Sequence, residues 1–146
     1  MKLALSIALP VFILFQAPNA EDAAKKDLAA MQGPWILTGL EADGKDAAPA
    51  KLEGTTLTIK GDIYLLKTKS QSHEVRLKLD ASKAPKHVNM TFLDGANKDK
   101  TLEGIYEVKD GTLRIARGLL PDQRRPEQFA TWPNTSYFVM TWTKKE

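Results

Sequence analysis

The chain is predicted to be all-β: a single, about eight-stranded antiparallel up-and-down barrel preceded by a short helix. Runs of alternating apolar and polar residues follow one another along it, with the period of two that is typical of half-buried strands. Residues that favour tight turns, such as Gly61-Asp62 and Asp110-Gly111, separate these runs. We expect closure into a barrel because closure removes the unpaired edges of an open sheet. An open sandwich of two sheets is the alternative.

The first twenty residues are expected to be an export signal. Lys2 precedes an apolar stretch of about thirteen residues, which fits a signal peptide and is too short to cross a membrane. Small residues up to Ala20 predict cleavage there, leaving one domain over 21–146. The alternative, an uncleaved amphipathic anchor, lacks the charged face that such a helix needs. We therefore expect a secreted or periplasmic protein with no membrane span.

The elements follow in order. Residues 22–32 are rich in alanine, lysine and leucine and contain no proline or glycine, which favours a short helix ending at Gly33-Pro34. The last strand is apolar on both faces, so its outer side needs a cover, from the N-terminal helix or from a partner protein. Strands are expected at 35–41, 55–60, 63–66, 73–80, 87–92, 100–109, 112–117 and 136–143.

Composition excludes several classes of function. Without residues 1–20 the chain keeps 126 residues, with 20 basic and 18 acidic side chains interleaved along it, so no single-sign field would recruit nucleic acid. It has no cysteine, which excludes thiol catalysis and cysteine-bound metals. We expect a monomer with no cofactor.

Gly33-x-Trp35, after a short helix and at the start of the first strand, resembles the opening of lipocalin-like barrels. In that superfamily the tryptophan plugs one end of the barrel, and a basic side chain of the last strand packs across its ring. The resemblance implies these roles for Trp35 and Lys144, or for Lys145 if the register shifts. A cation over an indole face contributes about 0.5–2 kcal/mol.

An ordered set of motifs is similar to a family of small secreted bacterial lipocalin-like domains, numerous in planctomycetes, whose function is not established. The match runs from about Leu28 to Lys144. Pro34 and Ala116 stand where members usually show threonine and often cysteine. The resemblance implies a lipocalin-like fold and export, and it supplies no catalytic residues. The motifs are Met31-Gln32-Gly33-Pro34-Trp35, Asp43-Gly44-Lys45, 79–86, Gly104-Ile105-Tyr106-Glu107 and 125–129.

Two groups of residues are candidates for ligand binding. The first could line an internal cavity or be ordinary core. If Gly39 and Gly104 face inward, they would either leave part of the barrel interior unfilled or let the sheet curl shut. The second belongs to the strandless segment 118–135, which would be either a lid with an arginine facing an anionic group or a loop pinned to the wall. The first group is Tyr64, Met90, Phe92, Tyr106 and Tyr137; the second is Arg124, Arg125, Phe129 and Trp132.

Catalytic apparatus is not visible in the sequence. His73 and His87 are the only histidines, and their spacing matches no compact metal motif. The chain also lacks a nucleophile elbow and a phosphate-cradling glycine loop. We expect neither an enzyme nor a metal site.

The sequence thus predicts a non-enzymatic barrel that binds a small, largely apolar ligand in its mouth. The alternative is a protein-interaction or inhibitor module that acts through its outer surface and the 118–135 loop. A solid core would favour this alternative.

Overall fold

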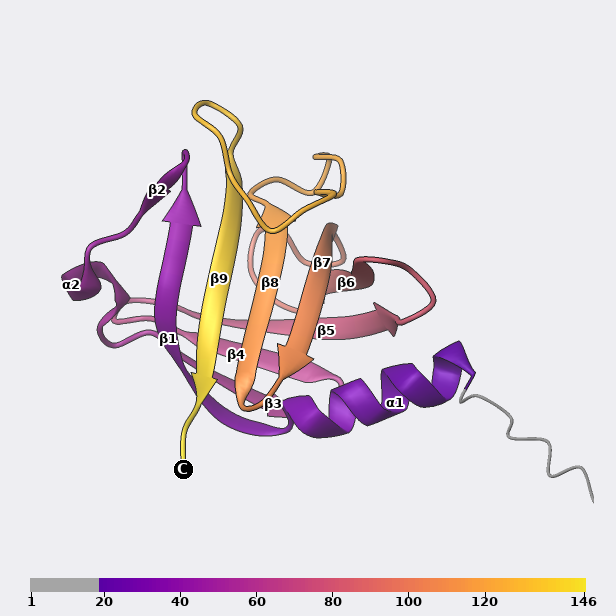
Figure 1. The fold of residues 1–146 in the computed structure, drawn as a ribbon. Coiled ribbons are helices and arrows are strands. Elements are labelled where there is room, and N and C mark those ends of the chain that lie inside the picture. The colour runs from indigo at the N-terminus through magenta and orange to yellow at the C-terminus, as the bar shows by residue number, and fades with distance from the viewer. Residues whose placement is uncertain (1–18) are drawn as a thin grey trace, which may run out of the picture.

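The computed structural model describes residues 19–146, which contain two helices and nine strands (Figure 1). The predicted signal segment lies outside the described residues, except for its last two. The elements are α1 (Ala20–Met31), β1 (Gly33–Ala42), β2 (Lys45–Asp46), α2 (Pro49–Leu52), β3 (Thr56–Lys60), β4 (Ile63–Lys67), β5 (Ser72–Asp80), β6 (Lys86–Phe92), β7 (Thr101–Lys109), β8 (Thr112–Gly118) and β9 (Tyr137–Lys144).

Eight of the strands form a closed antiparallel barrel. From β3 to β9 each strand pairs with the next along the chain, and β1 pairs with both β3 and β9. The seam between β1 and β9 runs from Trp35 opposite Lys144 to Ala42 opposite Phe138. β2 is an additional short strand on the end of β1. The predicted up-and-down barrel with an N-terminal helix is confirmed, and the open sandwich is excluded.

The two turns that the sequence singled out form the expected hairpins. Gly61 has a φ of 61° between β3 and β4. Asp110 and Gly111 have φ values of 50° and 73° between β7 and β8, the left-handed pair that a two-residue hairpin turn requires. These turns fix the register, so that Leu57, Ile59, Leu113 and Ile115 all face the interior core.

Helix α1 lies across the end of the barrel at which β1 begins and β9 ends (Figure 1). The Asn19 side chain caps the helix by accepting a hydrogen bond from the backbone N–H of Asp22 at 2.8 Å. Tyr106 Oη donates to Asp27 Oδ2 at 2.8 Å, and Lys86 Nζ lies 2.7 Å from the same oxygen. The helix is therefore fastened to the barrel through one carboxylate.

Trp35 seals this end of the barrel. It is 1% exposed, and its indole Nε1 donates to the Met31 carbonyl of α1 at 2.8 Å. The ammonium of Lys144 lies 5.0 Å from its ring centroid and donates to the carbonyls of Ala30 and Gln32. The structure thus places Trp35 and Lys144 in the two positions that the resemblance implied.

Gly39 and Gly104 are points of close backbone approach rather than sources of empty volume. The strand register shifts at a bulge between Leu37 and Gly39, and a Cβ at Gly39 would lie 3.2 Å from Thr141 Cβ. A Cβ at Gly104 would lie 2.7 Å from the Ala116 carbonyl oxygen. The bulge at Gly39 fits the second of the two sequence-based interpretations, in which a glycine lets the sheet curl.

The outer side of β9 is covered from within the chain, but not by α1. Phe138 pairs with inward-facing Arg117, and Met140 and Trp142 belong to the interior core. Val139 faces outward and packs with Phe129 of the loop between β8 and β9, residues 119–136. The long loop is therefore the cover of this wall.

Candidate functional site

The two ends of the barrel differ in how well their interior is sealed. At the α1 end, Met31, Trp35 and Ile59 are each 1% exposed, and the inward-facing Leu79 and Val108 are half-buried. At the other end, six inward-facing side chains are only half-buried. We call these six the mouth ring. The mouth ring consists of Ala42, Leu66, His73, Phe92, Arg117 and Phe138.

The mouth ring consists of inward-facing residues that lie opposite one another on neighbouring strands. Leu66 lies opposite His73, and Arg117 opposite Phe138. The His73 imidazole meets the Phe92 ring edge to face, with centroids 6.3 Å apart. Four of the six side chains are apolar, so the core has a partly exposed, largely apolar edge at this end.

Arg117 points into the barrel. It continues the inward series Leu113, Ile115, Arg117 of β8 and lies opposite Gly104, whose missing side chain makes room for it. Its Nη1 donates to the Gly118 carbonyl at 2.9 Å, whereas its fully buried Nε has no hydrogen-bond partner among the described residues. Burial lowers the pKa of the guanidinium, which remains charged because its ordinary value is far above neutrality.

Tyr64 and Trp142 meet in the interior. Tyr64 is 1% exposed and Trp142 is completely buried, and their rings are perpendicular with centroids 6.4 Å apart. Neither the Tyr64 hydroxyl nor the Trp142 Nε1 has a partner in the part of the chain that the structure describes. Burial raises the pKa of Tyr64, and the charge of Arg117 opposes that rise. Three buried polar groups thus lie inside the barrel without hydrogen bonds.

The residues predicted to line the interior divide into three groups. Tyr64, Met90 and Phe92 face inward as ordinary core: Tyr64 and Met90 are buried in it, and Phe92 packs against it from the mouth ring. Tyr106 also faces inward, but its hydroxyl serves α1 through Asp27; burial followed by this contact raises its pKa. Tyr137 lies on the outside of the wall, where its hydroxyl donates to the Arg124 carbonyl at 3.0 Å, so its predicted place in an internal cavity is wrong.

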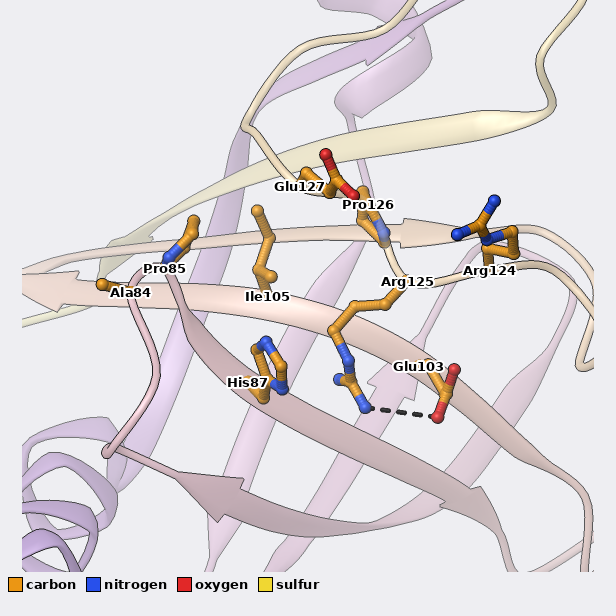
Figure 2. A pocket seen from close by; sticks show the side chains of 9 residues that line it. All are labelled: Ala84, Pro85, His87, Glu103, Ile105, Arg124, Arg125, Pro126 and Glu127. Atoms are coloured by element: carbon orange, nitrogen blue, oxygen red, sulfur yellow. Dashed lines mark hydrogen bonds and ion pairs between the residues drawn. The ribbon is translucent and has the colours of Figure 1, made fainter.

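The 119–136 loop forms a second site, a pocket of about 610 Å³ on the outer face of β6 and β7 (Figure 2). The Arg125 side chain extends from the loop between His87 and Glu103 toward the wall. It donates to the Val88 and Gly104 carbonyls at 3.0 and 2.6 Å, to Asn89 Oδ1 at 2.8 Å and to Glu103 Oε1 at 3.3 Å. Its hydrogen-bonding capacity is therefore used by the protein itself.

Other contacts also hold the 119–136 loop against the barrel wall. Phe129 packs on the wall, and the Arg114 guanidinium lies 4.6 Å from its ring centroid. Thr131 donates to Glu41 Oε1 through its amide and its hydroxyl, at 2.8 and 2.7 Å. Of the loop candidates, only Arg124 and Trp132 are exposed. The structure thus shows the pinned arrangement of this loop and not a lid over the mouth.

The two histidines lie in different places. His73 belongs to the mouth ring, with Nδ1 3.7 Å from Asp94 Oδ1. His87 lines the outer pocket, where burial and then the charge of Arg125 lower its pKa. Within residues 19–146, no three histidine, aspartate or glutamate side chains gather as a metal site would require.

Sequence reasoning missed the two polar side chains that distinguish the interior. The sequence marks the last strand as apolar on both faces, which draws no attention to the Trp142 indole N–H, and Arg117 stands at the end of the expected strand 112–117. The sequence does contain a signal for the direction of Arg117. Residues two apart in a strand face the same side, so Arg117 should face inward like Ile115.

The fold and the site together define a closed eight-stranded β-barrel with one end covered by α1 and a largely apolar, partly exposed ring of side chains at the other. No helix among the described residues has the length and apolar character to cross a membrane. No protein-family model, curated protein or solved structure matches the chain.

Proposed function

We propose that this protein is an exported, non-enzymatic binding protein that takes a small, largely apolar molecule into the barrel through the mouth ring. The proposal rests on one observation: inward-facing Leu66, Phe92 and Phe138 stay partly exposed, whereas Trp35 and Met31 are fully buried at the α1 end. Apolar surface left in water is unfavourable by about 25 cal/mol per Å². A ligand with an apolar body would cover it.

The inward wall supports the same ligand class. Inward of the mouth ring, the barrel is filled by a core of aliphatic and aromatic side chains such as Val75, Met90 and Leu102. Sites of this kind bind small molecules through apolar contacts and use a few polar groups for orientation. The export signal expected at residues 1–20 would place this binding outside the cytoplasm.

The experiment is titration with Nile red, a neutral apolar dye whose fluorescence rises in apolar surroundings. We expect saturable binding of one dye per chain, weakened about tenfold or more by Phe92→Asp, because a carboxylate in the mouth ring is costly to desolvate. Ile36→Asp is the matched control, since Ile36 is a 40% exposed apolar residue of β1 outside the mouth ring. Absence of saturable binding, or equal loss in both variants, would contradict the proposal.

A second candidate function has its own observation. The loop residues Leu119, Leu120 and Trp132 are 49%, 52% and 48% exposed, and exposed apolar side chains on a pinned loop suit a protein partner. Native mass spectrometry of protein purified from its own source separates the two functions. A retained small molecule supports the binding protein, whereas a bound protein that is lost in Trp132→Ser supports the interaction module.

A further inference from the structure

We propose that the outer surface of the barrel carries a second binding site, for a neutral saccharide of β-linked pyranose units. Trp132 is its stacking platform, and the exposed side chains of residues 124–128 are its hydrogen-bonding partners. The site is separate from the mouth ring, so this inference goes beyond the proposed function and does not depend on it.

The site is a groove made of two adjoining pockets. The outer pocket of about 610 Å³ and a second pocket of about 250 Å³ are both lined by residues 124–127, so they meet along this segment. His87 and Ile105 belong to the first pocket, and Trp132 and Tyr137 belong to the second. The groove therefore suits a ligand made of linked units.

The first argument is the exposed aromatic platform. Trp132 is 48% exposed, whereas the other two tryptophans, Trp35 and Trp142, are 1% and 0% exposed. The face of an aromatic ring carries partial negative charge. The ring face of a β-linked glucose unit presents C–H groups, because its hydroxyls are equatorial, and these groups carry partial positive charge. A pyranose ring therefore stacks favourably on Trp132.

The second argument is rigidity. Thr131, directly before the platform, donates twice to Glu41 Oε1, at 2.8 and 2.7 Å. On the other side, the Asn134 backbone N–H donates to Asp43 Oδ1 at 3.1 Å. The backbone of Trp132 is thus held between two attachments to the barrel before a ligand arrives, which lowers the entropic cost of binding.

The third argument is charge. Arg125 faces the wall and is paired with Glu103 at 3.3 Å (Figure 2). Arg124 and Glu127 are exposed, and none of the ion pairs among the described residues includes either. His87 adds no charge at neutral pH, because burial and then the charge of Arg125 lower its pKa. The positive and negative charges of the groove balance, which favours a neutral ligand.

The fourth argument is hydrogen bonding. A guanidinium only donates and a carboxylate only accepts, whereas an amide and a sugar hydroxyl do both. Arg124, Glu127 and the exposed Gln128 therefore complement neighbouring hydroxyls of one ring. A protein partner would instead use the exposed Leu119 and Leu120, which line neither pocket.

The first experiment follows Trp132 by fluorescence. Because Trp35 and Trp142 are buried, acrylamide should quench mainly Trp132. The probes are cellohexaose, xylohexaose and the β-1,4-linked hexamer of N-acetylglucosamine. We expect at least one of them to protect Trp132 from acrylamide in a saturable manner. Its binding should be the same in about 50 and about 500 mM NaCl, since a neutral ligand is not screened by salt.

Matched variants then test the two parts of the groove by calorimetry. Trp132→Ala should weaken binding about tenfold or more, whereas Leu120→Ala, at a 52% exposed position of the same loop, should bind as wild type. Glu127→Gln should weaken binding about threefold to tenfold. Asp122→Asn, at an exposed acidic position of this loop outside both pockets, should not.

The outcomes separate this site from the barrel. Phe92→Asp in the mouth ring should leave saccharide binding unchanged. Absence of protection by all three hexamers, or equal losses in Trp132→Ala and Leu120→Ala, would overturn the saccharide site and leave the proposed function intact. A bound protein that requires both Trp132 and Leu120 would overturn it in favour of the interaction module. Hexamer binding without Nile red binding would overturn the proposed function alone.

Discussion

Lys144 and Trp35 join the first and last strands of the barrel at its sealed end. They are direct cross-strand partners in the β1–β9 seam, and the ammonium lies 5.0 Å from the indole centroid. Lys144 also donates to the Ala30 and Gln32 carbonyls at the end of α1. One side chain therefore connects the seam, the buried tryptophan and the helix.

Removal of the Lys144 charge is expected to destabilise the barrel. Lys144→Met loses the cation–π contact and two charge-assisted hydrogen bonds, and should lower the free energy of unfolding by about 2–3 kcal/mol in urea denaturation. Lys145→Met is the matched control, because Lys145 is exposed and contributes its backbone N–H, which donates to the Pro34 carbonyl. Similar losses in the two variants would show that the contact with Trp35 is unimportant.

The attachment of α1 is expected to depend on Asp27. Asp27→Ala leaves the Tyr106 hydroxyl unpaired and removes the partner of Lys86. It should cost about 2–3 kcal/mol and speed amide hydrogen exchange in α1. Asp22→Ala, an exposed residue of the same helix, should cost less than about 1 kcal/mol. Unchanged exchange in α1 of the Asp27 variant would mean that apolar packing alone holds the helix.

Arg125 is expected to hold the 119–136 loop on the wall. Arg125→Ala removes hydrogen bonds to four acceptors on β6 and β7. It should cost about 2–3 kcal/mol and raise hydrogen exchange across the loop. The neighbouring exposed Arg124, replaced by alanine, should leave exchange unchanged, because only its carbonyl is used, by Tyr137. A loop that stays protected without Arg125 would contradict the assignment.

Stability is expected to fall in mild acid partly because of His87. Burial and then the charge of Arg125 lower the pKa of its imidazole in the folded state. Protonation therefore favours the unfolded chain: the contribution is fully present above the ordinary histidine value of 6.5 and is lost as the pH falls below it. His87→Gln should flatten the melting-temperature profile between pH 7 and pH 5. Parallel profiles for wild type and variant would exclude this role.

Local sequence signals predicted most of the barrel. The Gly61-Asp62 and Asp110-Gly111 turns and the alternation on both sides of them were sufficient for the hairpins, because register follows from turn geometry and the side-chain period. The short elements β2 and α2 were not predicted. They lie in a segment whose apolar residues follow neither the strand repeat nor the helix repeat. Elements of two to four residues are also too short for such a repeat to be recognised.

The long loop and the interior were less predictable for different reasons. Arg125 and Thr131 bond to Val88 and Glu41, which are 37 and 90 positions away in the chain, and no local pattern reports such contacts. The inward direction of Arg117 was available from alternation, but a charged residue at the end of a strand suggests solvent. Such departures from a local rule are expected at functional sites.

The seal formed by Trp35 and α1 has a kinetic consequence. A barrel that is blocked at one end has a single route of exchange, so an occupant must leave by retracing its path of arrival, with its last group in becoming its first group out. Residence time would then depend on how readily the deepest contacts are rehydrated, and the side chains of the mouth ring would affect the rates of arrival and departure as well as the affinity.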